Sequence, residues 1–155
     1  MECNMEIIKG GVTAAKGFCA AGLNAGIKNN EKKDMAMVYS EKPCVTAGTF
    51  TTNKVFAAPV KWDKDIVANS PFAQAVVVNS GVANACTGKE GDDACAAEAK
   101  AVSEALQVPE SAVLVASTGV IGAQLPMDKI CAGIKELPKK LGSSLDHGTL
   151  AAEAI

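Results

Sequence analysis

Apolar residues recur with the period of a β-strand in the first half of the chain. Residues 34–40 are apolar at every second position, and the apolar run 73–79 is typical of a strand buried on both faces. After a break at Glu41-Lys42-Pro43, the β-branched stretch 44–52 predicts the second arm of a hairpin-like pair. A further short strand is predicted around Val12, after a Gly-Gly turn. The first half is therefore expected to be rich in sheet.

In the second half the apolar period changes to that of helices. A helix is predicted from Asp92, a suitable N-cap, to Pro109, with apolar residues on one face at Cys95, Ala99, Val102 and Leu106. A strand begins at Val113 and precedes a second helix, which has Pro126 in its first turn and ends at Pro138. The predicted core face of that helix consists of Ile130, Ile134 and Leu137, and residues 151–155 show a helical pattern again. This order of elements predicts an α+β or α/β layered domain.

Composition narrows the class of protein. The chain has 155 residues, 48% hydrophobic residues, 21% charged residues and a net charge of −2. These values fit one soluble globular domain and give no basic surface for nucleic acid. The first ten residues lack the apolar core of a signal peptide, and no apolar run is long enough to span a membrane. We therefore expect a cytosolic protein without nucleic-acid or membrane partners.

Cysteine and histidine give little support to metal or thiol chemistry. The chain has no C-x-x-C pair, and its cysteines lie among small or apolar residues, so free, buried thiols are expected rather than disulfides or metal ligands. The six cysteines are Cys3, Cys19, Cys44, Cys86, Cys95 and Cys131. His147 is the only histidine and lies in a polar stretch that reads as a turn, so it is not expected to act in catalysis.

The strongest candidate for chemistry is the segment Ser117-Thr118-Gly119, at the end of the apolar strand that begins at Val113. A hydroxyl beside a glycine amide can direct two hydrogen-bond donors to one point, which is what the oxyanion of a tetrahedral acyl-transfer intermediate needs. The alternative is a plain turn, in which glycine supplies a permissive backbone and Ser or Thr bonds locally. Acyl transfer is thus the first reaction to consider.

Two other polar segments follow predicted strands. One contains Asn79, Ser80, Asn84 and Thr87, whose side chains either line a ligand pocket or satisfy their own backbone. The other contains Thr51, Thr52, Asn53 and Lys54, where the lysine either meets a carboxylate or is simply solvated. The Gly81 to Lys89 segment is not a nucleotide-binding P-loop, because its second glycine comes too late and no Ser or Thr follows the lysine.

Four segments together carry a resemblance to a known family. They read GGVTAAKGF, AGTFTTNKVFAAPV, VVVNSGVANACTG and VLVASTGVIGAQLPMDKI, in this order. From Gly10 to Ile155 the chain resembles the N-terminal half of the ornithine acetyltransferases, also called bifunctional glutamate N-acetyltransferases. The resemblance implies an α+β fold, a layered αββα sandwich of the N-terminal-nucleophile-like type. It also implies that residues 1–155 are a single domain, the N-terminal (α-chain) part of a self-processing enzyme.

The resemblance implies a specific reaction. Family members move the acetyl group of N2-acetylornithine to glutamate by a ping-pong route in arginine biosynthesis, and some accept acetyl-CoA. The precursor cleaves itself before a threonine, which becomes the nucleophile. Thr118 and Gly119 match the family's oxyanion hole. No resident cofactor or metal is implied, and the expected partner is the C-terminal β chain in an α/β hetero-oligomer.

The chain also departs from the family pattern. Val82 stands where the family usually has an asparagine, and Ala15 stands where a proline is common. The sequence stops at Ile155, before the threonine-rich segment and the cleavage junction, so the chain alone is expected to be inactive. Two alternatives to acetyl transfer remain open: an isolated non-catalytic fragment or binding module, and an amidase or aminopeptidase on the same architecture.

Overall fold

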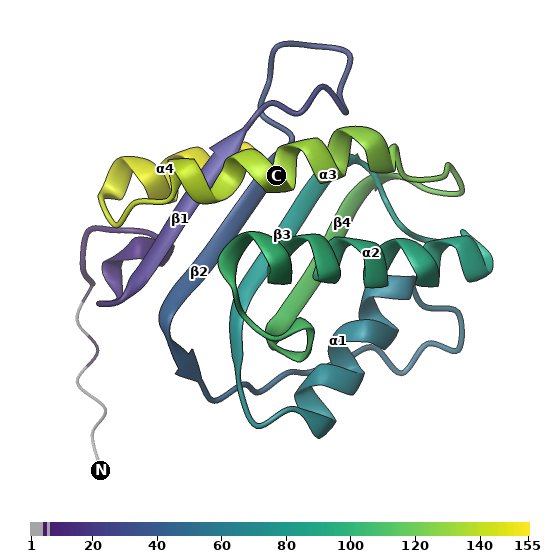
Figure 1. Cartoon of the computed structure of the whole chain (residues 1–155), viewed down its shortest axis with the longest axis horizontal. Helices are drawn as coiled ribbons and strands as arrows, with labels where there is room; N and C mark the ends of the chain where they lie inside the picture. Colours follow the sequence, from purple (N-terminus) through teal and green to yellow (C-terminus); the bar gives the residue numbers. More distant parts are fainter. Residues whose placement is uncertain (1–4, 6) are drawn as a thin grey trace.

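Four strands form one mixed sheet in the order β1-β2-β3-β4 (Figure 1). The structure is a computed structural model and describes residue 5 and residues 7–155. The strands are β1 (Phe18–Leu23), β2 (Met35–Cys44), β3 (Ala73–Val82) and β4 (Val113–Val120). The pairs β1-β2 and β2-β3 are antiparallel, whereas β3 and β4 run parallel. The carboxyl ends of β3 and β4 therefore meet at one edge of the sheet.

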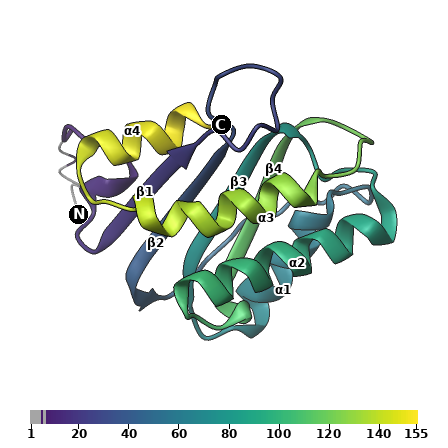
Figure 2. The ribbon, with the colours of Figure 1, turned by 45° about the horizontal axis from the view of Figure 1, so that its top comes forward.

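Helices cover the sheet unevenly. The α-helices are α1 (Ala58–Asn69), α2 (Gly88–Leu106), α3 (Met127–Glu136) and α4 (Leu145–Glu153), and 3₁₀ turns occur at Val12–Ala14, Glu110–Ala112 and Leu137–Lys140. The helices α2 and α3 lie side by side on one face, α4 lies over β1, and α1 lies beside β4 (Figure 2). One face of the sheet is therefore covered by a layer of helices, and α4 covers only part of the other face.

The main core lies between the sheet and the pair α2 and α3. Alternate residues of each strand point to this side, as the period of two requires. The fully buried members include Met35, Met37, Val77, Val115 and Ile130. The core is therefore built from aliphatic and methionine side chains, with Trp62 and Tyr39 at its margin.

The opposite face of the sheet is only partly covered. Small residues let α4 approach closely: Ala20 and Ala36 pack on Ala151 and Ala154, and a Cβ on Gly22 would collide with the backbone at Leu150. Farther along this face, the side chains are only half-buried. We call these five residues the open face: Val38, Val76, Val78, Leu114 and Ala116.

Much of the predicted architecture is confirmed. The α+β class is correct, and the strands predicted at 34–40, 73–79 and 113 correspond to β2, β3 and β4. Both predicted helices exist as α2 and α3, and the residues Ile130, Ile134 and Leu137 are fully buried. The described residues form one sheet, so they do not contain the second sheet of a four-layer sandwich.

Three predictions about the first half are wrong. Residues 45–57 contain no strand, and the partner of β2 is β1, whose sequence FCAAGL has small residues on both faces and therefore no alternating pattern. Instead of breaking at Glu41-Lys42-Pro43, β2 continues to Cys44 with a register irregularity after Tyr39. The segment around Val12 forms a 3₁₀ turn rather than a strand.

Helix boundaries also differ from expectation. Helix α2 begins at Gly88, with Thr87 at the N-cap position, so Asp92 lies inside the helix and pairs with Lys61 of α1 at 2.7 Å. Helix α1 was not predicted, although Pro59 in its first turn is a favourable starting signal. Of its residues only Pro59 and Ile66 are buried, which is too few for a visible apolar stripe.

Candidate active site

Ser117-Thr118-Gly119 lies at the carboxyl end of β4, beside Asn79-Ser80-Gly81 of β3. In the parallel ladder, Thr118 is the partner of Ser80 and Gly119 is the partner of Gly81. The two polar segments that the sequence singled out separately are therefore neighbours. They form adjoining strand ends at one edge of the sheet (Figure 1).

Alternation along β4 places the two predicted donors where a ligand can reach them. The outward backbone groups of Val113 and Val115 bond to Trp62 and Asp63 of α1, away from β3. Since the backbone groups of successive residues alternate in direction, the N–H of Gly119 also belongs to the outer edge of β4, the edge away from β3. The Thr118 side chain is exposed and shares a side of the sheet with the open face. Thr118 and Gly119 are both exposed residues.

Position 119 requires glycine for two reasons. Its φ of +135° is a conformation that residues with a side chain rarely adopt. A Cβ would also lie 2.7 Å from the backbone nitrogen of Val82 and collide with the carbonyl group of Gly81. The backbones of the two strand ends thus touch directly, and this contact fixes the position of Gly119.

The polar residues at the carboxyl end of β3 and in the loop after it bond to the protein's own groups, and Thr87 also lines a small pocket beside Lys61 and Asp92. Asn79, Ser80, Asn84 and Thr87 are all buried. The Asn79 amide donates to the carbonyl of Val82 at 2.9 Å, and the Asn84 amide donates to that of Gly91 at 2.8 Å. The Thr87 hydroxyl donates to Asn84 at 2.6 Å, and that of Ser80 donates to the carbonyl of Ala154. These bonds favour the interpretation in which the four side chains satisfy the protein's own groups.

The remaining candidates do not join the site. Thr51 and Asn53 accept hydrogen bonds from nearby backbone N–H groups, and Lys54 is exposed. His147 lies in α4 rather than in a turn, and its Nδ1 is 2.6 Å from the hydroxyl of Ser144. The described cysteines are free, and Cys3 lies outside the described residues. Among the described cysteines the expected burial holds only for Cys95: Cys86 is exposed, and the other three are half-buried.

Asp34 is a supporting residue that the sequence did not reveal. It is fully buried, and its carboxylate accepts backbone hydrogen bonds from Ala25 and Ile27 at 2.6 Å and from Lys28 at 2.9 Å. This holds the connection between β1 and β2 in place, where Ile27 and Lys28 lie against Gly81. A single aspartate before a strand is too common to have signalled this role.

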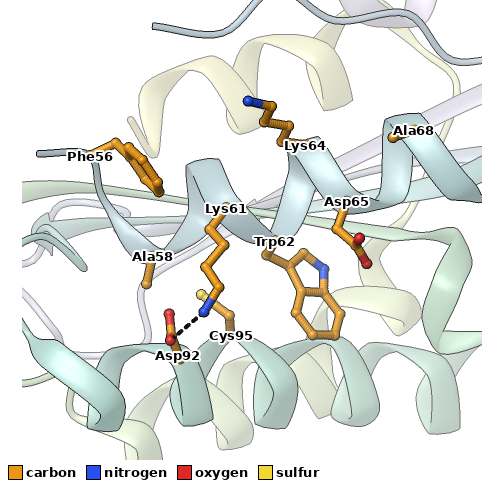
Figure 3. A pocket seen from close by; sticks show the side chains of 9 residues that line it. All are labelled: Phe56, Ala58, Lys61, Trp62, Lys64, Asp65, Ala68, Asp92 and Cys95. Atoms are coloured by element: carbon orange, nitrogen blue, oxygen red, sulfur yellow. Dashed lines mark hydrogen bonds and ion pairs between the residues drawn. The ribbon is translucent and has the colours of Figure 1, made fainter. Parts of the chain in front are cut away.

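A cavity of about 530 Å³ between α1 and α2 lies apart from Thr118 and Gly119 (Figure 3). Phe56 and Trp62 supply its aromatic lining, and the ion pair of Lys61 with Asp92 crosses it. Burial, together with the nearby Glu98, raises the pKa of the Cys95 thiol to about 12. The thiol is therefore protonated at neutral pH and is a poor nucleophile.

The described residues contain neither a cluster of metal-binding side chains nor a helix that could span a membrane. No group of three or more His, Cys, Asp or Glu side chains among them is arranged to hold a metal ion. Within the same residues, every helix is too short or too polar to cross a bilayer. Metal-assisted chemistry therefore has no candidate ligand set in the described part of the chain.

Comparison with solved structures defines the class of protein. The arginine biosynthesis bifunctional protein ArgJ of Bacillus halodurans superimposes with a TM-score of 0.89 at 43% identity, over 94% of this chain and 75% of that one. Ornithine acetyltransferase of Mycobacterium tuberculosis, solved with ornithine, gives 0.91 at 44% identity, over 94% and 78%. The chain therefore has the α+β fold of the N-terminal-nucleophile hydrolase class.

Sequence comparison gives the family. The ArgJ family model matches residues 19–155, and the chain belongs to the ArgJ family. Relatives named arginine biosynthesis bifunctional protein ArgJ include that of Gloeobacter violaceus, 47% identical over 98% of this chain, and that of Symbiobacterium thermophilum, 49% identical over 97%. The chain spans about 37% of the length of each of these relatives.

Proposed function

We propose that this chain is the N-terminal (α) portion of an acetyltransferase that moves the acetyl group of N2-acetylornithine to glutamate. Its role is to supply the oxyanion hole. The observation that carries the proposal is the exposed Thr118 hydroxyl beside the Gly119 backbone, which lies on the outer edge of β4. Membership of the ArgJ family and the names of its relatives support the choice of reaction.

The proposed reaction has two stages. A threonine of the C-terminal portion attacks the acetyl carbonyl carbon, and its hydroxyl proton passes to its own α-amino group. The carbonyl oxygen becomes an anion that accepts hydrogen bonds from the Thr118 hydroxyl and the Gly119 N–H. The α-ammonium group gives this proton to the departing nitrogen, so ornithine leaves with a free amine and an acetyl-threonine ester remains. The amine of glutamate then attacks this ester, and N-acetylglutamate is released.

The proposed partner is the C-terminal β chain, which arises from the same precursor by cleavage before the nucleophilic threonine. The open face is apolar, and Val120 and Ile121 beside the site are 63% and 66% exposed. An apolar surface of this kind is typical of an interface. Because Thr118 is on the same side, a partner covering the open face brings its own residues to the oxyanion hole.

The proposal requires no resident cofactor. Acetyl-CoA enters it only as an alternative acetyl donor, attacked by the same threonine with coenzyme A leaving as the thiol. A biosynthetic reaction of free amino acids also fits the cytosolic location expected from the sequence.

Substitution of Thr118 tests the oxyanion role. In the complete enzyme, Thr118→Val removes the donor and retains the shape of the side chain, so kcat should fall about 100-fold with little change in stability. The control is Ser111→Ala, which removes an exposed hydroxyl before the opposite end of β4 and should leave kcat unchanged. Equal turnover of the Thr118→Val enzyme and the wild type would remove Thr118 from the mechanism.

The intact mass and the acetyl acceptor test the rest of the proposal. Expression of the complete reading frame should give two chains, with the second beginning at threonine; one uncut mass would favour a binding module. With N2-acetylornithine as donor, the acetyl group should appear on glutamate. Its appearance only as free acetate would favour an amidase or aminopeptidase.

A further inference from the structure

We propose that Asn79 is a positioning residue of the oxyanion hole, acting on Gly119 through the backbone of Gly81 and Val82. The inference rests on the proposed function of Thr118 and Gly119. Asn79 has no exposed surface, so it does not contact substrate itself. Its amide donates to the carbonyl oxygen of Val82 at 2.9 Å and so spans Ser80 and Gly81.

The backbone that Asn79 holds is the surface on which Gly119 rests. A Cβ on Gly119 would collide with the carbonyl of Gly81 and lie 2.7 Å from the nitrogen of Val82, so the peptide group between these two residues is in direct contact with Gly119. Gly81 has a φ of +109°, a backbone conformation that residues with a side chain rarely adopt. We call the bend of the backbone at this residue the Gly81 kink. The hydrogen bond from Asn79 to Val82 spans it.

Gly81 is also supported from its other side. A Cβ on Gly81 would lie 3.1 Å from side-chain carbons of Ile27 and of Lys28, so the connection between β1 and β2 is packed against it. The carboxylate of Asp34 fixes that connection by its backbone hydrogen bonds. With the Asp34-held connection on one side and Gly119 on the other, the Gly81 kink has little room to shift without moving Gly119.

Only one of the two polar groups of the Asn79 side chain has a hydrogen-bond partner among the described residues. Its Oδ1 is buried, and no described residue donates a hydrogen bond to it. Burying an unpaired polar atom is unfavourable, typically by about 1–3 kcal/mol. The stabilising contribution of Asn79 is therefore its single bond to Val82, the bond that fixes the support of Gly119.

A double-mutant cycle in the complete enzyme separates positioning from general stability. Asn79→Ala should lower kcat about tenfold to 100-fold with the KM for N2-acetylornithine unchanged, because displaced donors weaken transition-state binding only. In the Thr118→Val background the same substitution should have a much smaller effect, since the hole is already impaired. Ser103→Ala is the control, because it removes a hydrogen bond to the carbonyl of Val108 at the far end of α2. It should change stability but not kcat.

The outcomes distinguish this proposal from the function on which it rests. If Thr118→Val lowers kcat and Asn79→Ala either does not lower it or acts additively, the positioning role is wrong and the oxyanion hole stands. If Thr118→Val itself has no effect, the oxyanion role fails first. Should Asn79→Ala not accumulate as folded enzyme, Asn79→Ser is put through the same cycle with the same criteria.

Discussion

The indole Nε1 of Trp62 donates a hydrogen bond of 3.0 Å to the backbone carbonyl of Val113. The next residue of α1, Asp63, accepts a bond of 3.0 Å from the backbone nitrogen of Val115. Two side chains of α1 therefore occupy the backbone positions that a further strand would fill beside β4. Covering an edge in this way protects it from pairing with other chains. It also fixes the strand that carries Thr118 and Gly119.

Removing the indole donor should destabilise the protein. Trp62→Phe keeps an aromatic ring but leaves the carbonyl of the fully buried Val113 without its partner, at a cost of about 1–3 kcal/mol. Urea unfolding measures the loss. Lys64→Ala, an exposed position on the same helix, is the control and should stay within about 0.5 kcal/mol of the wild type. Equal midpoints for both variants would mean that the Trp62 bond contributes nothing.

The contact between Gly119 and Gly81 predicts different costs for two glycine substitutions. Gly119 and Gly122 both have positive φ, at +135° and +84°, but a Cβ on Gly122 would meet nothing within 4 Å. Gly122→Ala should therefore cost only the backbone preference, about 1–2 kcal/mol. Gly119→Ala adds the collision with Gly81 and should cost at least about 1 kcal/mol more in unfolding free energy. An equal cost would show that the Gly81 backbone moves aside.

The cysteines should react in order of their access to solvent. Cys86 is exposed, whereas Cys95 is buried and the pKa of its thiol is raised to about 12. Since the thiolate is the reactive form, iodoacetamide at about pH 8 should modify Cys86 first and leave Cys95 unmodified in the folded protein. Peptide mass spectrometry after short reaction times gives the order. Early labelling of Cys95 would indicate that α1 and α2 separate readily.

The elements that sequence could predict are those with one clearly buried side. In α3, Ile130, Gly133 and Ile134 are buried, whereas Lys129, Ala132 and Lys135 are exposed, so the helical period is visible. In β1, Ala20 and Ala21 are both buried, one under α4 and the other in the main core. A strand buried on both faces by small residues shows no alternation, and its pairing with β2 depends on contacts that only the fold reveals.

The candidate site was predictable in part for a similar reason. A hydroxyl beside a glycine at the end of a predicted strand identified Thr118 and Gly119 as candidates, and their role remains a prediction. For Asn79 and Asn84, the sequence left two interpretations open, because an amide beside a strand end can serve either a ligand or its own loop. Burial favours the second interpretation, and burial is a property of the folded chain that the local sequence does not give.

Glu98 gives the protein a predicted dependence on pH. It lies on α2 without exposed surface, and neither carboxylate oxygen has a hydrogen-bond partner among the described residues. Burial raises the pKa of this carboxyl from 4.5 to about 8. The folded state thus binds the proton more tightly than the unfolded state. The associated stability is complete below about pH 4.5 and is lost as the pH rises to about 8.

Replacement by glutamine should remove this dependence. Across that interval the unfolding free energy of the wild type should fall, relative to Glu98→Gln, by about 1.4 kcal/mol per pH unit. Urea unfolding at about pH 5 and about pH 8 measures the difference. The exposed Glu104→Gln on the same helix serves as control and should follow the wild type. The pKa values of the nearby Cys95 and Cys131 thiols are raised above 9.0, so these groups do not titrate in the interval. Parallel curves for wild type and Glu98→Gln would mean that Glu98 ionises in the folded protein as readily as in the unfolded chain.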